Sequence, residues 1–110
     1  MFESREETQT PVVFESMTGP IRQNVQVTNE QGMHMIPCSR IAQLVRDTEC
    51  EVRIIRDNQI ADARNILDLL MLKAEAGTSL LVESEGEGAE LILARVVKLF
   101  EDDFEIEADS

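Results

Sequence analysis

The stretch Asn29-Glu30-Gln31-Gly32-Met33-His34-Met35-Ile36-Pro37-Cys38 is the most informative part of the chain, because it holds the only histidine in 110 residues. Gly32 permits a positive φ angle, and Pro37 is tolerated in the first turn of a helix. The pattern therefore predicts a loop that becomes a helix close to His34. A helix start favours an anion and disfavours a protonated imidazole. This position suits a neutral nucleophile toward phosphate, although a lone histidine here could also be a surface residue or a helix cap.

The segments around this stretch alternate between strand and helix patterns. Val25-Gln26-Val27 has the alternation of a strand. After His34, apolar residues recur with helical spacing and predict a helix, namely Cys38, Ile41, Ala42 and Val45. Residues 50–54 and 59–63 flank the turn signal Asp57-Asn58 and predict a β-hairpin.

The second half of the chain predicts two more helices and one more strand. Asn65 is a good N-cap for a short helix from Ile66 to Lys73. Gly77 breaks the chain before a strand at 79–83, and residues 89–100 carry a helical apolar stripe. With helices that are apolar on one side and a half-buried sheet, the order strand, helix, strand, strand, helix, strand, helix predicts an α+β two-layer sandwich in one domain.

Charge limits the partners of the protein. The formal net charge is −12 at pH 7, which argues against binding nucleic acid or an anionic membrane surface. No apolar run approaches the ~20 residues of a membrane-spanning helix. The first 30 residues lack the basic region and apolar core of a secretory signal. We therefore expect a cytoplasmic protein whose cysteines, Cys38 and Cys50, stay reduced.

The sequence offers little for metal binding or for hydrolysis. His34 and Cys38 could share a helix face, but a zinc site needs further ligands, and the chain has neither a Cys-x-x-Cys pair nor a second histidine. A glycine-rich phosphate loop, a Ser-His-Asp set and a paired-carboxylate arrangement are also missing. We expect no metal and no cofactor, and a phosphoryl group would have to come from a partner protein.

Gly32-Met33-His34-Met35-Ile36-Pro37-Cys38, preceded by Val25-Gln26-Val27-Thr28-Asn29, resembles the active-site region of HPr, the histidine-containing phosphocarrier protein of the phosphoenolpyruvate-dependent sugar phosphotransferase system. The family pattern is a glycine, an aliphatic residue, the histidine, two residues of which the second is normally arginine, a proline and a small residue. The likeness runs from about Asn24 to about Phe104. It implies an open-faced sandwich of order βαββαβα, with a four-stranded antiparallel sheet covered on one face by three helices.

The resemblance also implies a carrier rather than an enzyme. Enzyme I would phosphorylate the pros nitrogen of His34, and the phosphoryl group would pass to a sugar-permease component or a regulatory acceptor. The N–H groups of residues around Ile36 and Cys38 would bind the phosphate. In the family the start of the second helix lies beside this site, so Ile66, Leu67, Leu70 and Met71 would border the loop and form a surface for partner docking.

Two positions depart from the family pattern. Ile36 stands where the family has an arginine that pairs with the phosphate and with enzyme I, and Arg40 or Arg64 could supply the missing charge. Asn65 stands at the position of a regulatory serine, so control by a serine kinase is not expected there. These departures leave open a second interpretation, an HPr-like regulatory binding protein with little or no phosphotransfer.

The two ends of the chain fall outside the resemblance. Residues 1–22 are interpreted as an N-terminal extension, and 23–104 as the HPr-like domain. The extension can be a flexible arm, but Val12-Val13-Phe14 is apolar enough to dock on the domain or to form a dimer with a second copy. Residues 105–110 are interpreted as an acidic end, and the charged run from Glu101 to Asp109 as solvated.

Overall fold

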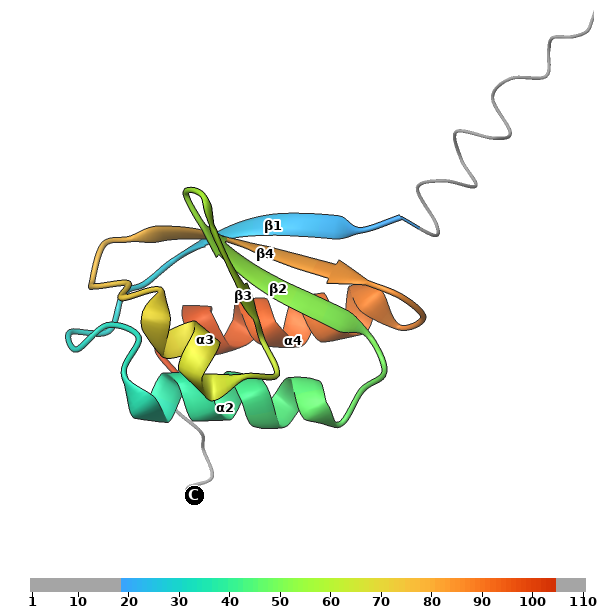
Figure 1. The fold of residues 1–110 in the computed structure, drawn as a ribbon, viewed down its shortest axis with the longest axis horizontal. Helices are drawn as coiled ribbons and strands as arrows, with labels where there is room; N and C mark the ends of the chain where they lie inside the picture. Colours follow the sequence, from blue (N-terminus) through green and yellow to red (C-terminus); the bar gives the residue numbers. More distant parts are fainter. Residues whose placement is uncertain (1–18, 105–110) are drawn as a thin grey trace, which may run out of the picture.

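The computed structural model describes residues 19–104, and within them the elements follow the predicted order (Figure 1). They are β1 (Ile21–Gln26), α2 (Met35–Arg46), β2 (Glu51–Arg56), β3 (Gln59–Asp62), α3 (Ile66–Met71), β4 (Ser79–Glu85) and α4 (Ala89–Glu101). The N-terminal segment up to residue 18 and residues 105–110 lie outside the described part. The proposed docking of Val12-Val13-Phe14 and the acidic end therefore stay predictions.

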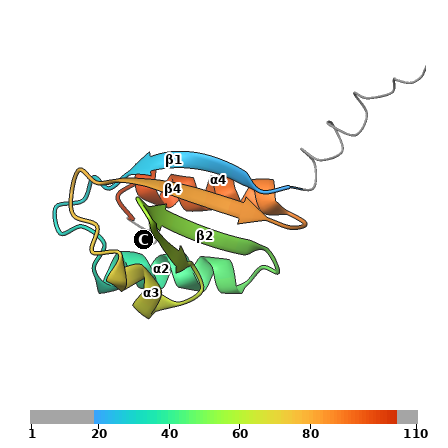
Figure 2. The same ribbon diagram turned by 45° about the horizontal axis from the view of Figure 1, so that its top comes forward.

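The strands form one antiparallel sheet in the order β1-β4-β2-β3. Figures 1 and 2 show the helices on one face of this sheet, with α2 beside α3 and α4 beneath β1 and β4. The other face is not covered by any described element. This is the predicted open-faced sandwich, and it is confirmed in element order and in layering.

The core lies between the helices and the covered face of the sheet. Alternate strand residues such as Val52, Ile54, Leu80 and Val82 are at most 2% exposed. They meet the apolar stripes of α2 and α4, which bury Cys38, Ile41, Ala42, Val45, Ile92, Leu93, Val96, Val97 and Phe100. Burial of these faces sets the position of the α2 N-terminus, where His34 lies.

The centres of the predicted elements are right, but several ends differ. β1 begins at Ile21, ahead of the alternating Val25-Gln26-Val27, because Ile21 already pairs with Ser84. β2 continues to Arg56 because the hairpin pairs Arg56 with Gln59. The strand predicted at 79–83 extends to Glu85, which pairs with Glu51. In each case the strand continues as far as a partner strand offers hydrogen bonds.

The short helix α3 ends at Met71, before the predicted Lys73. Leu72 and Lys73 donate their N–H groups to the carbonyls of Leu69 and Leu70, at 3.2 and 3.1 Å, which tightens the last turn. Lys73 then has φ of 52°, a left-handed conformation that cannot continue the helix.

Candidate functional site

The loop before His34 depends on Gly32 for its path. Gly32 has φ of 72°, and a Cβ atom there would lie 2.6 Å from the Ala74 carbonyl oxygen. The Met33 N–H donates to that oxygen at 2.8 Å, and the Asn29 side chain donates to the Gly32 carbonyl at 2.7 Å. The predicted positive φ at Gly32 is confirmed. The loop is fixed to the segment after α3 by backbone contact that only a glycine permits.

His34 occupies the N-cap position of α2, as the loop-to-helix pattern predicted. Its backbone is extended, with φ of −96° and ψ of −165°, and its side chain makes no capping hydrogen bond. The imidazole is half-buried. Because the ring is neither a cap nor part of the core, its nitrogens are available for chemistry at the surface.

The first turn of α2 presents two backbone donors beside His34. The N–H groups of Met35 and Ile36 precede the first intrahelical hydrogen bond, and Pro37 has no N–H. The Cys38 N–H donates to the His34 carbonyl oxygen at 3.2 Å and closes the first helical turn. The Cys38 N–H is used in this helical bond, whereas the Ile36 N–H is suited to an anion, and the phosphate contacts expected from both residues stay predictions.

His34 lines an open depression of about 440 Å³ on the surface. Residues of the loop, of the first turn of α2 and of the chain after α4 contribute to it. They are Thr28, Asn29, Glu30, Gln31, His34, Ile36, Pro37, Asp103 and Phe104. Within the described part of the chain, two of these residues carry carboxylates and none carries a positive charge. The depression has room for a phosphoryl group but lacks the cation that usually accompanies one.

Asp103 and Phe104 were missed by the sequence, which indicated a solvated acidic run after Glu101. Phe104 is 5% exposed and packs edge-on against Phe100, with ring centroids 4.8 Å apart. The Thr28 hydroxyl donates to the Asp103 carboxylate. Asp103 thus lies at the edge of the site, with its side chain exposed to solvent as predicted for this acidic run. The signal in the sequence was Phe104, an aromatic residue within an otherwise charged segment.

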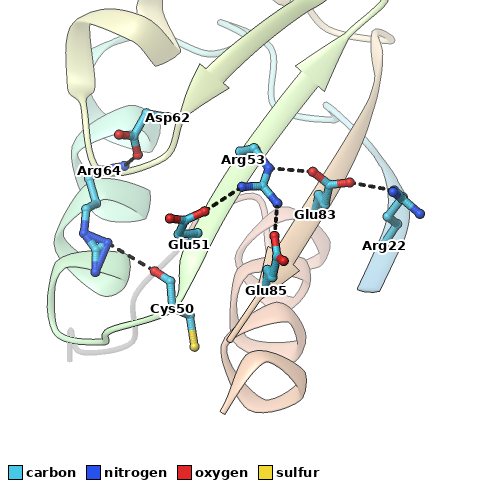
Figure 3. Close-up of polar contacts among 8 residues, drawn as sticks. All are labelled: Arg22, Cys50, Glu51, Arg53, Asp62, Arg64, Glu83 and Glu85. Atoms are coloured by element: carbon cyan, nitrogen blue, oxygen red, sulfur yellow. Dashed lines mark hydrogen bonds and ion pairs between the residues drawn. The ribbon is translucent and has the colours of Figure 1, made fainter. Parts of the chain in front are cut away.

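The two arginines considered as substitutes for the family arginine lie in different places. Arg40 is on the same face of α2 as Ile36, one turn further along, and is partly buried. Arg64 donates to the carbonyls of Thr48 and, at 3.2 Å, Cys50, which follow the opposite end of α2 (Figure 3). Arg64 therefore points away from His34, and Arg40 is the remaining candidate.

Asn65 serves as the N-cap of α3, as predicted. Its side-chain oxygen accepts from the N–H groups of Leu67 and Asp68, at 3.0 and 3.2 Å. The neighbouring Arg64 carbonyl accepts from Arg46 at the end of α2, at 3.3 Å. The start of α3 thus lies toward the C-terminal end of α2 and not beside His34 as the resemblance implied. The chain after α3 meets the loop instead, at Ala74.

The predicted docking residues divide into exposed and packed members. Leu67 and Met71 are 69% and 62% exposed, whereas Ile66 and Leu70 are partly buried against the core. On the first turn of the neighbouring α2, Met35 and Ile36 are 56% and 54% exposed. We call these four exposed residues, Met35, Ile36, Leu67 and Met71, the apolar surface. Large exposed side chains on two adjacent helices are typical of a protein-binding surface.

Other chemistry finds little support near His34. Burial raises the pKa of the Cys38 thiol to about 11, so this residue is a neutral core thiol. Within residues 19–104, no three His, Cys, Asp or Glu side chains form a group that could hold a metal ion. No described helix is long and apolar enough to cross a membrane.

Comparison with known proteins identifies relatives by sequence and proteins of the same fold by structure. Residues 21–102 match the family model of the PTS HPr component phosphorylation site. The chain is 34% identical over 86 residues to phosphocarrier protein NPr of Escherichia coli (strain K12), a match that covers 77% of this chain and 96% of that protein. It is 28% identical over 83 residues to phosphocarrier protein HPr of Treponema pallidum (strain Nichols), which covers 76% of this chain and 94% of that protein.

A solved structure, HPr-C-His from Thermoanaerobacter tengcongensis, matches the fold with a TM-score of 0.73 at 21% identity, over 76% of this chain and 94% of that one. It supports the architecture of the sheet and helices described above. The family match covers every strand and helix of the described domain. The chain therefore belongs to the HPr family of the phosphotransferase system.

Proposed function

We propose that this protein is a phosphocarrier that accepts a phosphoryl group on His34 from enzyme I and passes it to a sugar-permease component or a regulatory acceptor, in the cytoplasm. The observation that carries the proposal is the state of His34: an uncommitted imidazole at a helix start, lining an open depression. The relatives named as phosphocarrier proteins support the same role.

The transfer needs few groups from the carrier. A ring nitrogen of His34, the pros nitrogen, attacks phosphorus with its lone pair, and a new N–P bond forms while the donor's bond to phosphorus breaks. The donor atom keeps the electron pair of that bond. The second transfer reverses these roles, so His34 is regenerated and the protein is an intermediate rather than a turnover catalyst.

The first turn of α2 would stabilise the phosphoryl oxygens. The N–H groups of Met35 and Ile36 have no intrahelical acceptor, and the helix start carries about half a positive charge. Each charge-assisted hydrogen bond is worth about 1.5–3 kcal/mol. Arg40 is the cation that could add to this stabilisation, because Ile36 offers only its backbone.

Enzyme I would dock on the apolar surface. Met35 and Ile36 are exposed beside His34, and Leu67 and Met71 continue the surface onto α3. A partner that covers these four side chains also covers the His34 depression and excludes water from it. Exclusion of water strengthens the electrostatic contacts to the phosphoryl group and limits its hydrolysis.

A second candidate function follows from the depression itself. Ile36 and two carboxylates, with no cation among the described lining residues, suit a regulatory protein that binds a partner without accepting phosphate. The two candidate functions predict different masses for the protein after incubation with a phosphoryl donor. The test incubates the full chain with phosphoenolpyruvate and enzyme I from the same organism and records the intact mass, with His34→Ala as the matched control.

The carrier proposal expects one added phosphate, labile in acid and stable in alkali, on the wild type and none on His34→Ala. An unchanged wild-type mass with an enzyme I that phosphorylates itself would contradict the carrier and favour the regulatory protein. An added phosphate that is still present on His34→Ala would show that another residue is phosphorylated.

A further inference from the structure

The chain after α4 returns to the His34 depression through an unusual backbone. Asp103 and Phe104 both have left-handed φ angles, 56° and 64°, although neither is glycine. Non-glycine residues in this conformation are strained and persist only where the surroundings hold them. Here the Asp103 and Phe104 N–H groups donate to the carbonyls of Phe100 and Leu99, at 3.2 and 2.7 Å. The Phe104 ring is also buried, and together these contacts anchor the chain after α4 beside the His34 depression.

This anchor places one carboxylate at the site. Thr28, from the segment before the histidine loop, donates its hydroxyl hydrogen to Asp103, and both residues line the depression with His34. Asp103 and His34 belong to the wall of one depression, and charges on such a wall interact where their separation is within the Debye length of about 8 Å at physiological ionic strength. Within the described residues, no lysine or arginine lines it to offset Asp103.

The geometry points to Asp103 as the residue that raises the free energy of the phosphorylated carrier and so favours onward transfer. This inference rests on the proposed function of His34. A phosphoryl group on His34 carries close to two negative charges at neutral pH. The Asp103 carboxylate repels them in the phosphorylated protein but meets no such charge in the free protein. Asp103 thus acts on the equilibrium of transfer and does not form a bond in it.

The test is an exchange of phosphoryl groups between two carriers. Isotope-labelled wild type and unlabelled variant are mixed in equal amounts with catalytic enzyme I and less phosphoenolpyruvate than carrier. Enzyme I equilibrates the phosphoryl group between them as each N–P bond forms and breaks, and intact mass gives the phosphorylated fraction of each. Asp103→Asn removes the charge, keeps an acceptor for Thr28, and suits a left-handed backbone.

At equilibrium, we expect the ratio of phosphorylated to unphosphorylated protein to be roughly threefold to tenfold higher for Asp103→Asn than for the wild type. This difference between the two ratios should become smaller when salt is added. Asp102→Asn is the matched control: it makes the same charge change at the adjacent residue, which does not line the depression. Its ratio should equal that of the wild type. Thr28→Val tests the hydrogen bond to Asp103 separately from the charge of Asp103, because it removes the hydrogen bond and leaves the carboxylate. It should not raise the ratio.

Three results would overturn the inference: equal ratios for Asp103→Asn and wild type, an equally large effect of Asp102→Asn, or a rise in Thr28→Val that matches Asp103→Asn. All three presuppose that the wild type is phosphorylated at His34. If it is not, the proposed function fails and the inference fails with it, so the two failures are told apart by the wild-type spectrum alone.

Discussion

Among single residues, Gly32 and His34 together define the site. Gly32 lets the loop approach the backbone of Ala74 and Glu75, and this approach holds His34 at the start of α2. The histidine then has a free imidazole because its backbone, and not its side chain, takes the N-cap position. The chemistry of the site thus depends on a backbone conformation as much as on the reactive side chain.

Gly32→Ala should destabilise the domain strongly. The added Cβ would meet the Ala74 carbonyl oxygen at 2.6 Å in a residue with positive φ. We expect a loss of roughly 2 kcal/mol or more in the free energy of unfolding, measured by chemical denaturation. Gly77→Ala is the control, because Gly77 also has positive φ but no atom within 4 Å of the added Cβ. It should lose only about 1 kcal/mol. Equal losses would show that the close approach is not the cause.

The missing family arginine can be tested at Ile36 and Arg40. Ile36→Arg should accelerate phosphorylation by enzyme I about tenfold if the new guanidinium contributes ~1.4 kcal/mol in the transition state. If Arg40 already supplies the charge, Ile36→Arg will change little and Arg40→Ala will slow the initial rate. Arg64→Ala is the control, because Arg64 contacts carbonyls beyond the far end of α2. No change in any variant would mean that the helix start alone binds the phosphoryl group.

At the scale of elements, α2 and α3 together form the surface that a partner would meet. Four of their exposed side chains are large and apolar, although the chain as a whole carries a net charge of −12. The contrast makes the apolar surface a distinct feature of the molecule. Met35 and Ile36 directly follow His34 in the chain, so a partner bound to this end of the surface would also meet His34.

Leu67→Glu should weaken binding to enzyme I at least tenfold, since a residue that contributes strongly to an interface is worth about 2 kcal/mol or more. Leu91→Glu on α4 is the matched control. Leu91 is 59% exposed, close to the 69% of Leu67, but lines a different depression, with Cys50 and Arg95. Calorimetric titration of folded variants gives the affinities. Equal affinities for both variants would remove α3 from the interface.

The elements show what local sequence can and cannot predict. The helical spacing of apolar residues predicted α2, and the residue type predicted the N-cap at Asn65, because both signals lie within a few residues of the element they describe. Such local signals missed the end of β2, which depends on pairing with β3, and the end of α3, which depends on the backbone of Lys73. Thr28 and Asp103 lie 75 positions apart, so no local pattern could join them at one site. For the same reason, the sequence could not choose between Arg40 and Arg64 as the cation nearer to His34.

On the scale of the whole molecule, the uncovered face of the sheet is held by an ion cluster across three strands (Figure 3). Arg53 on β2 donates to Glu83 on β4 at 2.5 Å, and Arg22 on β1 donates to the other oxygen of Glu83 at 2.6 Å. Arg53 also reaches Glu51 and Glu85. The Glu83 side chain is only 11% exposed, so its charge depends on these partners.

Stability should therefore depend on pH through Glu83. Its hydrogen bonds with Arg53, and then with Arg22, hold its pKa below the usual value for a glutamate, despite partial desolvation. The folded protein thus binds the Glu83 proton less readily than the unfolded chain. The stabilisation is fully present above the unfolded pKa of about 4.3 and is lost as pH falls through the lower folded value.

Glu83→Gln should reduce the free energy of unfolding by about 1–3 kcal/mol at neutral pH, and the difference from wild type should shrink in strong acid. Denaturation at a series of pH values measures both effects. Glu85→Gln, with a side chain 42% exposed, should have a smaller effect. A Glu83→Gln deficit that stays constant down to strongly acidic pH would contradict the ion-pair account.

Phosphoryl transfer by this protein would use one nitrogen atom of His34, and phosphorus–nitrogen NMR observes that atom directly. The protein is labelled with ¹⁵N and incubated with phosphoenolpyruvate and enzyme I. We expect one new phosphorus resonance, coupled to the pros nitrogen of His34, which disappears when a competent acceptor is added. A spectrum that stays unchanged while enzyme I itself becomes phosphorylated, or a phosphorus signal on any other residue, would contradict the assignment of His34 as the carrier of the phosphoryl group.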